Sequence, residues 1–167
     1  MSFIWPTSER SLTVTRADLD TFVKHVVRIA KAGVPPVVAG SMGEAHHLTN
    51  EERVTLVKAA RAGLDAAGLT SVPIIAGTGL AGTRVTIELT REIAAAGADV
   101  AIVISSGYFV GALNKKAQKQ LFIDVADASP IPIMVYNCTF LTPHSSPHLA
   151  LTFRFAERPR CNWRPGP

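Results

Sequence analysis

The strongest constraint on the fold is a repeat of short apolar runs separated by helix-like segments. The runs begin at residues 34, 72, 99 and 131 and read VPPVVAG, VPIIAGTG, DVAIVISSG and IPIMVYN. Their unbroken Val and Ile content is typical of strands buried on both faces of a parallel sheet. Intervals of 38, 27 and 32 residues match the βα repeat of an α/β protein. Functional residues are therefore expected at the carboxyl ends of the strands.

The segments between the runs carry apolar residues on one helical face, which predicts four α-helices. Residues that cap or stop helices occur near the ends of these segments. FIW at residues 3–5 would be the end of an earlier strand, giving about five strands. The expected helix boundaries are Thr15 and Gly33, the T-x-x-E capping box of Thr49 and Glu52, Thr83 and Gly97, and Asn114 and Ala128.

Charge and composition exclude several classes of protein. Residues 1–137 hold 13 Lys and Arg against 12 Asp and Glu, so most of the net charge of +4 belongs to the tail. Since nucleic-acid binding needs a basic patch on a folded face, we expect no nucleic-acid partner. No apolar run approaches the ~20 residues of a membrane span, and the N-terminus does not resemble a secretory signal. We expect a soluble, cytoplasmic protein.

The tail, residues 138–167, differs from the rest of the chain. It holds five of the 11 prolines and both cysteines, and it contains no βα unit. We place a boundary between Asn137 and Cys138, which separates a body of residues 1–137 from an irregular Pro/Arg-rich tail. The composition favours a read-through of out-of-frame or non-coding sequence. The alternative is a genuine replacement that caps an open sheet.

One glycine motif raises the alternative of a nucleotide-binding domain. GTGLAG at 77–82 fits the G-x-G-x-x-G pattern that cradles a pyrophosphate between a strand and a helix. A dinucleotide site also needs an acid at the end of the next strand, whereas Asp99 begins that strand. A tight βα turn is the preferred interpretation.

Histidines and cysteines predict no metal site. His46 and His47 are adjacent, and on a helix they would point about 100° apart, which is unsuitable for chelation. With two cysteines and no signal sequence, a disulfide is not expected either. The tail's four candidate ligands, which lack the C-x₂-C pair of a zinc knuckle, are Cys138, His144, His148 and Cys161.

Two hydroxyl residues are better candidates for chemistry. Ser41 and Tyr136 both follow predicted strands, so both are expected at the same end of the sheet. Hydroxyl groups donate and accept hydrogen bonds, so a serine beside a tyrosine can relay protons. The equally weighted alternative is that Ser41 caps a turn and Tyr136 packs in the core.

Taken together, four stretches resemble the dihydrodipicolinate synthase/N-acetylneuraminate lyase family of class I pyruvate aldolases. They occur in the family's order over about residues 16–137. The resemblance implies a (β/α)8 TIM barrel of which only about the first five strands and four helices are present, so the chain is truncated. The longer SSGYF loop is closer to the 4-hydroxy-2-oxoglutarate aldolase branch. The matching stretches are KAGVPPVVAGSMGEAHHLTNEER, VPIIAGTGLAGTRVTIELT, AAGADVAIVISSGYF and IPIMVYN.

The resemblance also implies roles for individual residues. A lysine on the sixth strand forms a Schiff base with the ketone of pyruvate, and no cofactor or metal takes part. Tyr136 would shuttle protons to and from the substrate, and Ser41 would join that relay. The pyruvate carboxylate would bind Ser41 and the backbone N–H groups of Ser41 and Met42. Tyr108 would be the aromatic residue lent by a neighbouring subunit, unless the alignment shifts this role to Phe109.

Departures from the family pattern predict a catalytically inactive chain. Met42 stands where the family usually has a hydroxyl residue. The last lysine is Lys119, before the predicted fifth strand, and Arg164 cannot act as an amine nucleophile because it stays protonated. The alternatives are a non-catalytic interaction protein, forming a homo-oligomer or pairing with full-length relatives, and a nucleotide-binding α/β protein.

Overall fold

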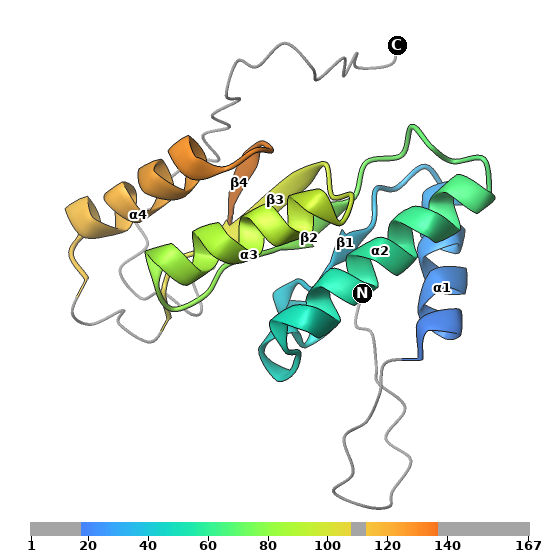
Figure 1. Cartoon of the computed structure of the whole chain (residues 1–167), viewed down its shortest axis with the longest axis horizontal. Coiled ribbons are helices and arrows are strands. Elements are labelled where there is room, and N and C mark those ends of the chain that lie inside the picture. Colours follow the sequence, from blue (N-terminus) through green and yellow to red (C-terminus); the bar gives the residue numbers. More distant parts are fainter. Residues whose placement is uncertain (1–17, 108–112, 137–167) are drawn as a thin grey trace, which may run out of the picture.

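The computed structural model describes residues 18–107 and 113–136, which form one parallel sheet and four α-helices (Figure 1). The strand order is β1-β2-β3-β4, and each neighbouring pair is parallel. The predicted alternation of strands and helices is confirmed, while FIW at 3–5 and the tail lie outside the described residues. The elements are α1 (Leu19–Lys31), β1 (Val37–Val38), α2 (Asn50–Ala66), β2 (Ile75–Gly77), α3 (Thr83–Ala95), β3 (Val100–Ile104), α4 (Lys115–Ala128) and β4 (Ile133–Tyr136).

Most predicted helix ends are confirmed. Thr49 and Glu52 form both hydrogen bonds of the capping box at the start of α2. Asn114 caps α4 by accepting a hydrogen bond from the N–H of Ala117. Gly33 and Gly97 follow α1 and α3 with φ of +79° and +106°, the left-handed backbone that ends helices at low cost.

Two predicted caps are wrong. Asp18, rather than Thr15, caps α1, because its carboxylate accepts a hydrogen bond from the N–H of Thr21 at 3.1 Å. The N-cap of α3 is Gly82, which has no side chain to offer, and Thr83 is the first helical residue. The N-cap of α1 lies three residues after Thr15, and the N-cap of α3 lies one residue before Thr83. The preference of threonine for N-cap positions alone therefore misplaced both boundaries.

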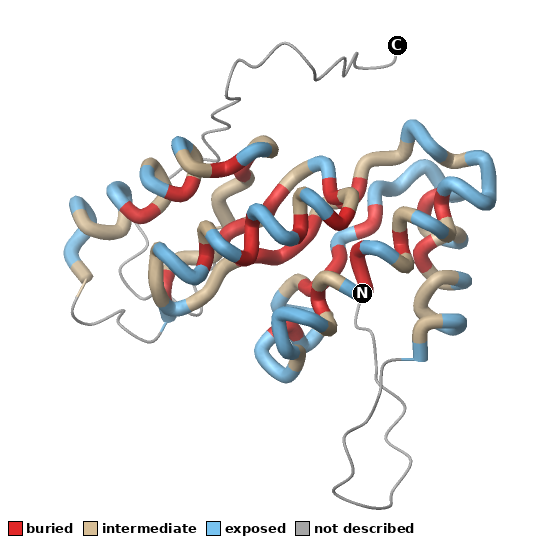
Figure 2. Tube along the Cα trace, in the orientation of Figure 1, coloured by how far each residue is buried: buried red, intermediate tan, exposed pale blue. Residues whose placement is uncertain are grey.

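Helices α2, α3 and α4 pack on one face of the sheet, and α1 packs against α2. Alternate strand residues on that face are buried against them, including Val38, Ala76 and Val103 (Figure 2). Residues of the other face, such as Val37 and Ile102, are exposed or half-exposed, because no described element packs on them. The sequence predicted strands buried on both faces, so the described part of the fold provides only half of the expected cover.

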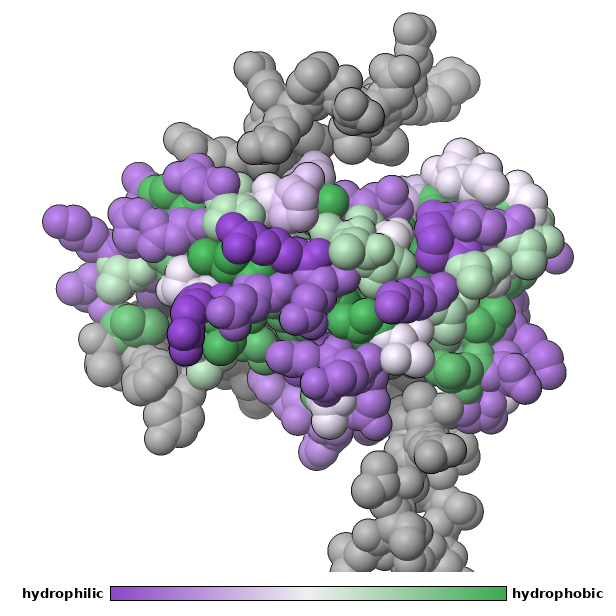
Figure 3. Space-filling view, in the orientation of Figure 1, coloured by the Kyte–Doolittle hydropathy of each residue, from purple (hydrophilic) through white to green (hydrophobic). Residues whose placement is uncertain are grey.

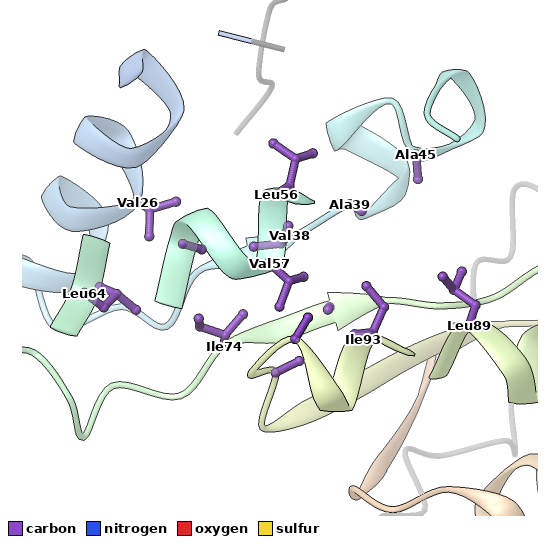
Figure 4. Close-up of a cluster of buried hydrophobic side chains, with 14 of the residues drawn as sticks. Val26, Val38, Ala39, Ala45, Leu56, Val57, Leu64, Ile74, Leu89 and Ile93 are labelled. Atoms are coloured by element: carbon purple, nitrogen blue, oxygen red, sulfur yellow. The ribbon is translucent and has the colours of Figure 1, made fainter. Parts of the chain in front are cut away.

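Two apolar clusters hold this layer together. The larger one joins α1, α2 and α3 to β1 and β2, and Val57, Leu64 and Ile93 at its centre are fully buried (Figure 4). The smaller one joins α4 to β3 and β4 around Val103 and Val125. Charged and polar side chains predominate over the outer surface of the helices (Figure 3), as expected of a solvent-facing layer.

Candidate active site

The carboxyl ends of the strands open into a cavity of about 530 Å³. Ser41 and Met42, which follow β1, and Tyr136, the last residue of β4, all line it. The glycines that follow β1 and end β2 form part of its floor, together with Ile102 and Ile104 of β3. Three of the four predicted site residues therefore share one cavity, whereas Tyr108 lies outside the described residues.

The loop after β1 consists of two short 3₁₀ turns, η1 (Ser41–Gly43) and η2 (Ala45–His47). The carbonyl of Gly40 accepts hydrogen bonds from the N–H groups of Gly43 at 2.9 Å and Ala45 at 3.4 Å. Ala39 and Glu44 adopt left-handed backbone with φ of +52° and +55°. Such conformations cost a non-glycine residue about 1–3 kcal/mol, so surrounding contacts must impose the shape of this loop.

The candidate hydroxyl groups do not bond to each other. Within the described residues, the side chains of Ser41 and Tyr136 form no hydrogen bond, and Tyr136 is half-exposed. Met42 is 59% exposed at the cavity rim. Glu44 is also exposed and forms the hinge between the two 3₁₀ turns. Both hydroxyls are therefore available to a ligand within the same cavity.

Arg53 is a cavity residue that the sequence did not single out. It lies in the first turn of α2, is only 3% exposed, and donates a hydrogen bond from Nη2 to the carbonyl of Ala45. Its Nε is buried without a partner among the described residues, and burial lowers the pKa of the guanidinium. The only sequence signal was its place in the stretch LTNEER, which marks a helix start rather than a buried cation.

The cavity wall is cationic. Its charged residues are Arg28 and Arg53, which line it together with His25 and His46, and no Asp or Glu of the described residues does. Nη2 of Arg28 lies 2.9 Å from Nδ1 of His25, and burial together with the charge of Arg28 lowers the pKa of His25. Such a wall favours an anionic ligand over a cationic one.

Close packing accounts for two glycines of GTGLAG. A Cβ on Gly77 would lie 1.9 Å from the carbonyl oxygen of Ala39, and one on Gly79 would lie 2.8 Å from the backbone N of Ile104. Gly82 caps α3 and does not line the cavity. Asp99 accepts a hydrogen bond from the N–H of Ile74 at 2.8 Å, at the opposite end of the sheet. These contacts support the tight-turn interpretation.

Buried threonines fix α3 to the carboxyl end of β2. Oγ1 of Thr90 lies 2.9 Å from Oγ1 of Thr78 and 2.7 Å from the carbonyl oxygen of Thr86, and all three side chains are at most 1% exposed. Because each hydroxyl satisfies a group that water cannot reach, this network positions the cavity floor.

Replacing Thr90 by valine should lower the free energy of unfolding by about 1–3 kcal/mol, because the Thr78 hydroxyl loses its partner. Urea denaturation followed by circular dichroism measures this. Thr55→Val is the matched control: Thr55 is an exposed helical threonine whose hydroxyl also bonds a carbonyl one turn earlier. It should change stability by less than about 0.5 kcal/mol. Equal effects of the two substitutions would contradict a special role for the network.

Lysines are absent from the cavity wall. The six lysines of the chain lie on α1, α2 and α4, and none is among the described residues that line the cavity.

The described residues also contain no group of three or more His, Cys, Asp or Glu side chains that could hold a metal ion. No helix in the described ranges is long and apolar enough to cross a membrane.

Successive parallel βα units with a polar rim at the strand carboxyl ends define part of a (β/α)8 barrel. The chain belongs to the dihydrodipicolinate synthetase family, whose sequence profile matches residues 1–148. The resemblance inferred from the four motifs is thereby confirmed.

Proteins similar to this chain are aldolases and synthases. It is 46% identical over 121 residues, 72% of its length, to the Emericella nidulans protein named probable 4-hydroxy-2-oxoglutarate aldolase, mitochondrial, and covers 39% of it. It is 42% identical to an L-threo-3-deoxy-hexylosonate aldolase of Hypocrea jecorina, over 82% of this chain and 42% of that protein.

A solved structure is similar over the same part of the fold. It is a chloride-inhibited dihydrodipicolinate synthase from Acinetobacter baumannii in complex with pyruvate, with a TM-score of 0.68 and 30% identity. The alignment covers 76% of this chain and 42% of that one. The chain thus spans about two fifths of the length of these relatives.

Proposed function

We propose that this chain is the amino-terminal half of a Schiff-base aldolase that acts on pyruvate, and that it forms no Schiff base by itself. The observation that carries the proposal is the shared cavity: Ser41, Met42 and Tyr136 line it, and its charged wall residues are cationic. Such a cavity suits a small 2-oxo acid, whose carboxylate needs donors and whose ketone needs proton transfer.

In this proposal the loop after β1 holds the carboxylate. The N–H groups of Ser41 and Met42 open η1, where the first N–H groups of a helical turn lack intrahelical partners. The Ser41 hydroxyl adds a donor and links the bound acid to Tyr136. Tyr136 carries protons to and from the substrate, and Tyr108 of a neighbouring subunit is the proposed third hydroxyl of the relay.

The proposed lack of turnover follows from the amines. A Schiff base needs a neutral lysine amine that reaches the substrate ketone. The six lysines of this chain lie on α1, α2 and α4, and none of them lines the cavity, so none is placed to attack a ketone there. The body, residues 1–137, would bind the substrate without supplying the lysine amine that forms the Schiff base, and residues 138–167 would be a separate tail.

The substrate class follows from the names of the relatives. These names are 4-hydroxy-2-oxoglutarate aldolase and L-threo-3-deoxy-hexylosonate aldolase, and they support a substrate of this class for the complete enzyme. A cytoplasmic location stays a prediction, since the name of the Emericella relative includes the word mitochondrial.

Borohydride trapping tests the first part of the proposal. The chain is incubated with pyruvate and sodium borohydride, and its intact mass is measured, with a full-length relative as the positive control. We expect an adduct on the relative and an unchanged mass for this chain. A pyruvate adduct on any of its lysines would overturn the proposed lack of Schiff-base formation.

Binding of pyruvate tests the second part independently. Titration followed by NMR shifts of the Ser41 and Met42 amides should reveal weak binding, and Ser41→Ala should weaken it at least about tenfold, since a hydrogen bond to a charged group is lost. Ser71→Ala, an exposed serine before β2 that does not line the cavity, is the control. Equal affinities of the two variants would exclude the proposed carboxylate site.

A further inference from the structure

The loop between β1 and α2 is anchored at two points, one before and one after the exposed residues 41–44 (Figure 4). At the first, the carbonyl of Ala39 packs so closely on β2 that a Cβ on Gly77 would lie 1.9 Å from its oxygen. At the second, the carbonyl of the buried Ala45 accepts a hydrogen bond from Nη2 of Arg53. The shape of the stretch between them depends on these two contacts.

The first turn of α2 holds Arg53 in a defined place. The capping box of Thr49 and Glu52 fixes the start of the helix, and the N–H of Arg53 donates to the carbonyl of Thr49 at 3.1 Å. The carbonyl of Ala45 also accepts a hydrogen bond from the N–H of Leu48 at 3.2 Å. The guanidinium is therefore not needed to satisfy that carbonyl. What its hydrogen bond adds is a connection between the loop and α2.

A buried arginine is an expensive way to stabilise a helix. The Arg53 side chain is 3% exposed, its Nε has no partner among the described residues, and burial lowers the pKa of its guanidinium. Replacing a buried charged group by an apolar side chain of similar size is often neutral or stabilising. Packing of α2 alone therefore does not explain an arginine at this position.

We propose that Arg53 is a positioning residue, which holds the loop so that the N–H groups of Ser41 and Met42 can receive a carboxylate. Without this contact the left-handed backbone of Glu44 would relax toward ordinary conformations and move both amides. Arginine suits the role because it is long, carries several donors and stays protonated. The effect on pyruvate rests on the proposed function, whereas the connection between loop and helix does not.

The experiment compares Arg53→Met with Arg61→Met in the full chain. Arg61 is the matched control because it lies on the same helix and also donates to backbone carbonyls, those of Leu69 and Val72, but does not line the cavity. Arg53→Met should weaken pyruvate binding about tenfold or more and change the Tm by less than about 2 °C. Arg61→Met should lower the Tm by about 3 °C or more and leave the affinity within about twofold.

Hydrogen exchange tests the connection without any ligand. The N–H of Gly43 donates to the carbonyl of Gly40 at 2.9 Å, and the N–H of His47 donates to that of Glu44 at 2.8 Å. Both hydrogen bonds belong to the 3₁₀ turns of the loop. Their exchange rates, measured by NMR, should rise about tenfold in Arg53→Met and stay unchanged in Arg61→Met.

Several outcomes would overturn the proposal. Unchanged exchange in Arg53→Met would mean that the loop keeps its shape without the guanidinium. A Tm that falls as far in Arg53→Met as in Arg61→Met, or a failure to fold, would make Arg53 a structural residue. Equal loss of affinity in both variants would make the effect a general one of destabilisation. If the unmodified chain binds no pyruvate, the proposed function fails, and the exchange rates alone decide the role of Arg53.

Discussion

The substitution Gly77→Ala should lower the free energy of unfolding by about 3 kcal/mol or more and leave little folded protein. The new alanine side chain has no room. Its Cβ would lie 1.9 Å from the carbonyl oxygen of Ala39 and 2.8 Å from the carbonyl carbon. Both atoms belong to the backbone, so no side chain can rotate away, and β1 would have to separate from β2. Overpacking that a core can absorb costs about 1–3 kcal/mol, and here the backbone itself must move.

Urea denaturation of the two variants Gly77→Ala and Gly43→Ala provides the measurement. A Cβ on Gly43 would meet no atom within 4 Å, and Gly43 does not have a positive φ. Its replacement should change stability by less than about 0.5 kcal/mol. If both variants were equally stable, the close approach of β1 and β2 at Gly77 would be wrong.

The substitution Ile93→Ala should also have a large effect. It should lower the free energy of unfolding by about 2–5 kcal/mol. Ile93 is fully buried on α3 within the larger cluster, where it packs between the helices and the sheet. Val57 and Leu64 of the same cluster lie on α2, so closing the space would require that helix to move. The cost therefore includes the cavity as well as the lost transfer of apolar surface.

Val85→Ala on the same helix is the comparison for Ile93→Ala. Val85 is 37% exposed, so its truncation leaves no internal cavity and should have less than a quarter of the effect. Thermal unfolding of both variants, followed at 222 nm, provides the test. Similar melting temperatures would show that α3 contributes little to the core.

The order of elements could be predicted because it depends on local pattern. Apolar runs at regular intervals located all four described strands, and the glycine stops at Gly33 and Gly97 were correct. The caps at Thr15 and Thr83 were wrong, because Asp18 and Gly82 are the N-cap residues of α1 and α3. Among the described residues only one face of the sheet is covered, whereas the Val-rich runs predicted cover on both faces, because this pattern does not say which segments of a chain provide the cover.

The candidate site was predictable where strand ends determine it. Ser41 and Tyr136 were expected at one end of a parallel sheet, and they line the same cavity. Arg53 escaped notice because a basic residue in a first helical turn normally faces solvent, while here η2 folds back over its guanidinium. That contact depends on a turn whose left-handed Glu44 no residue preference would suggest.

The left-handed backbone of Ala39 and Glu44 has a consequence for how binding depends on folding. Both residues would relax to ordinary backbone in a free peptide, so the neighbouring strand and α2 must supply the energy that keeps the loop in shape. The ligand-facing amides of Ser41 and Met42 are therefore arranged only while the surrounding layer is intact. Any molecule that recognises this arrangement would bind the folded state alone, so its affinity would add directly to the stability of the whole unit.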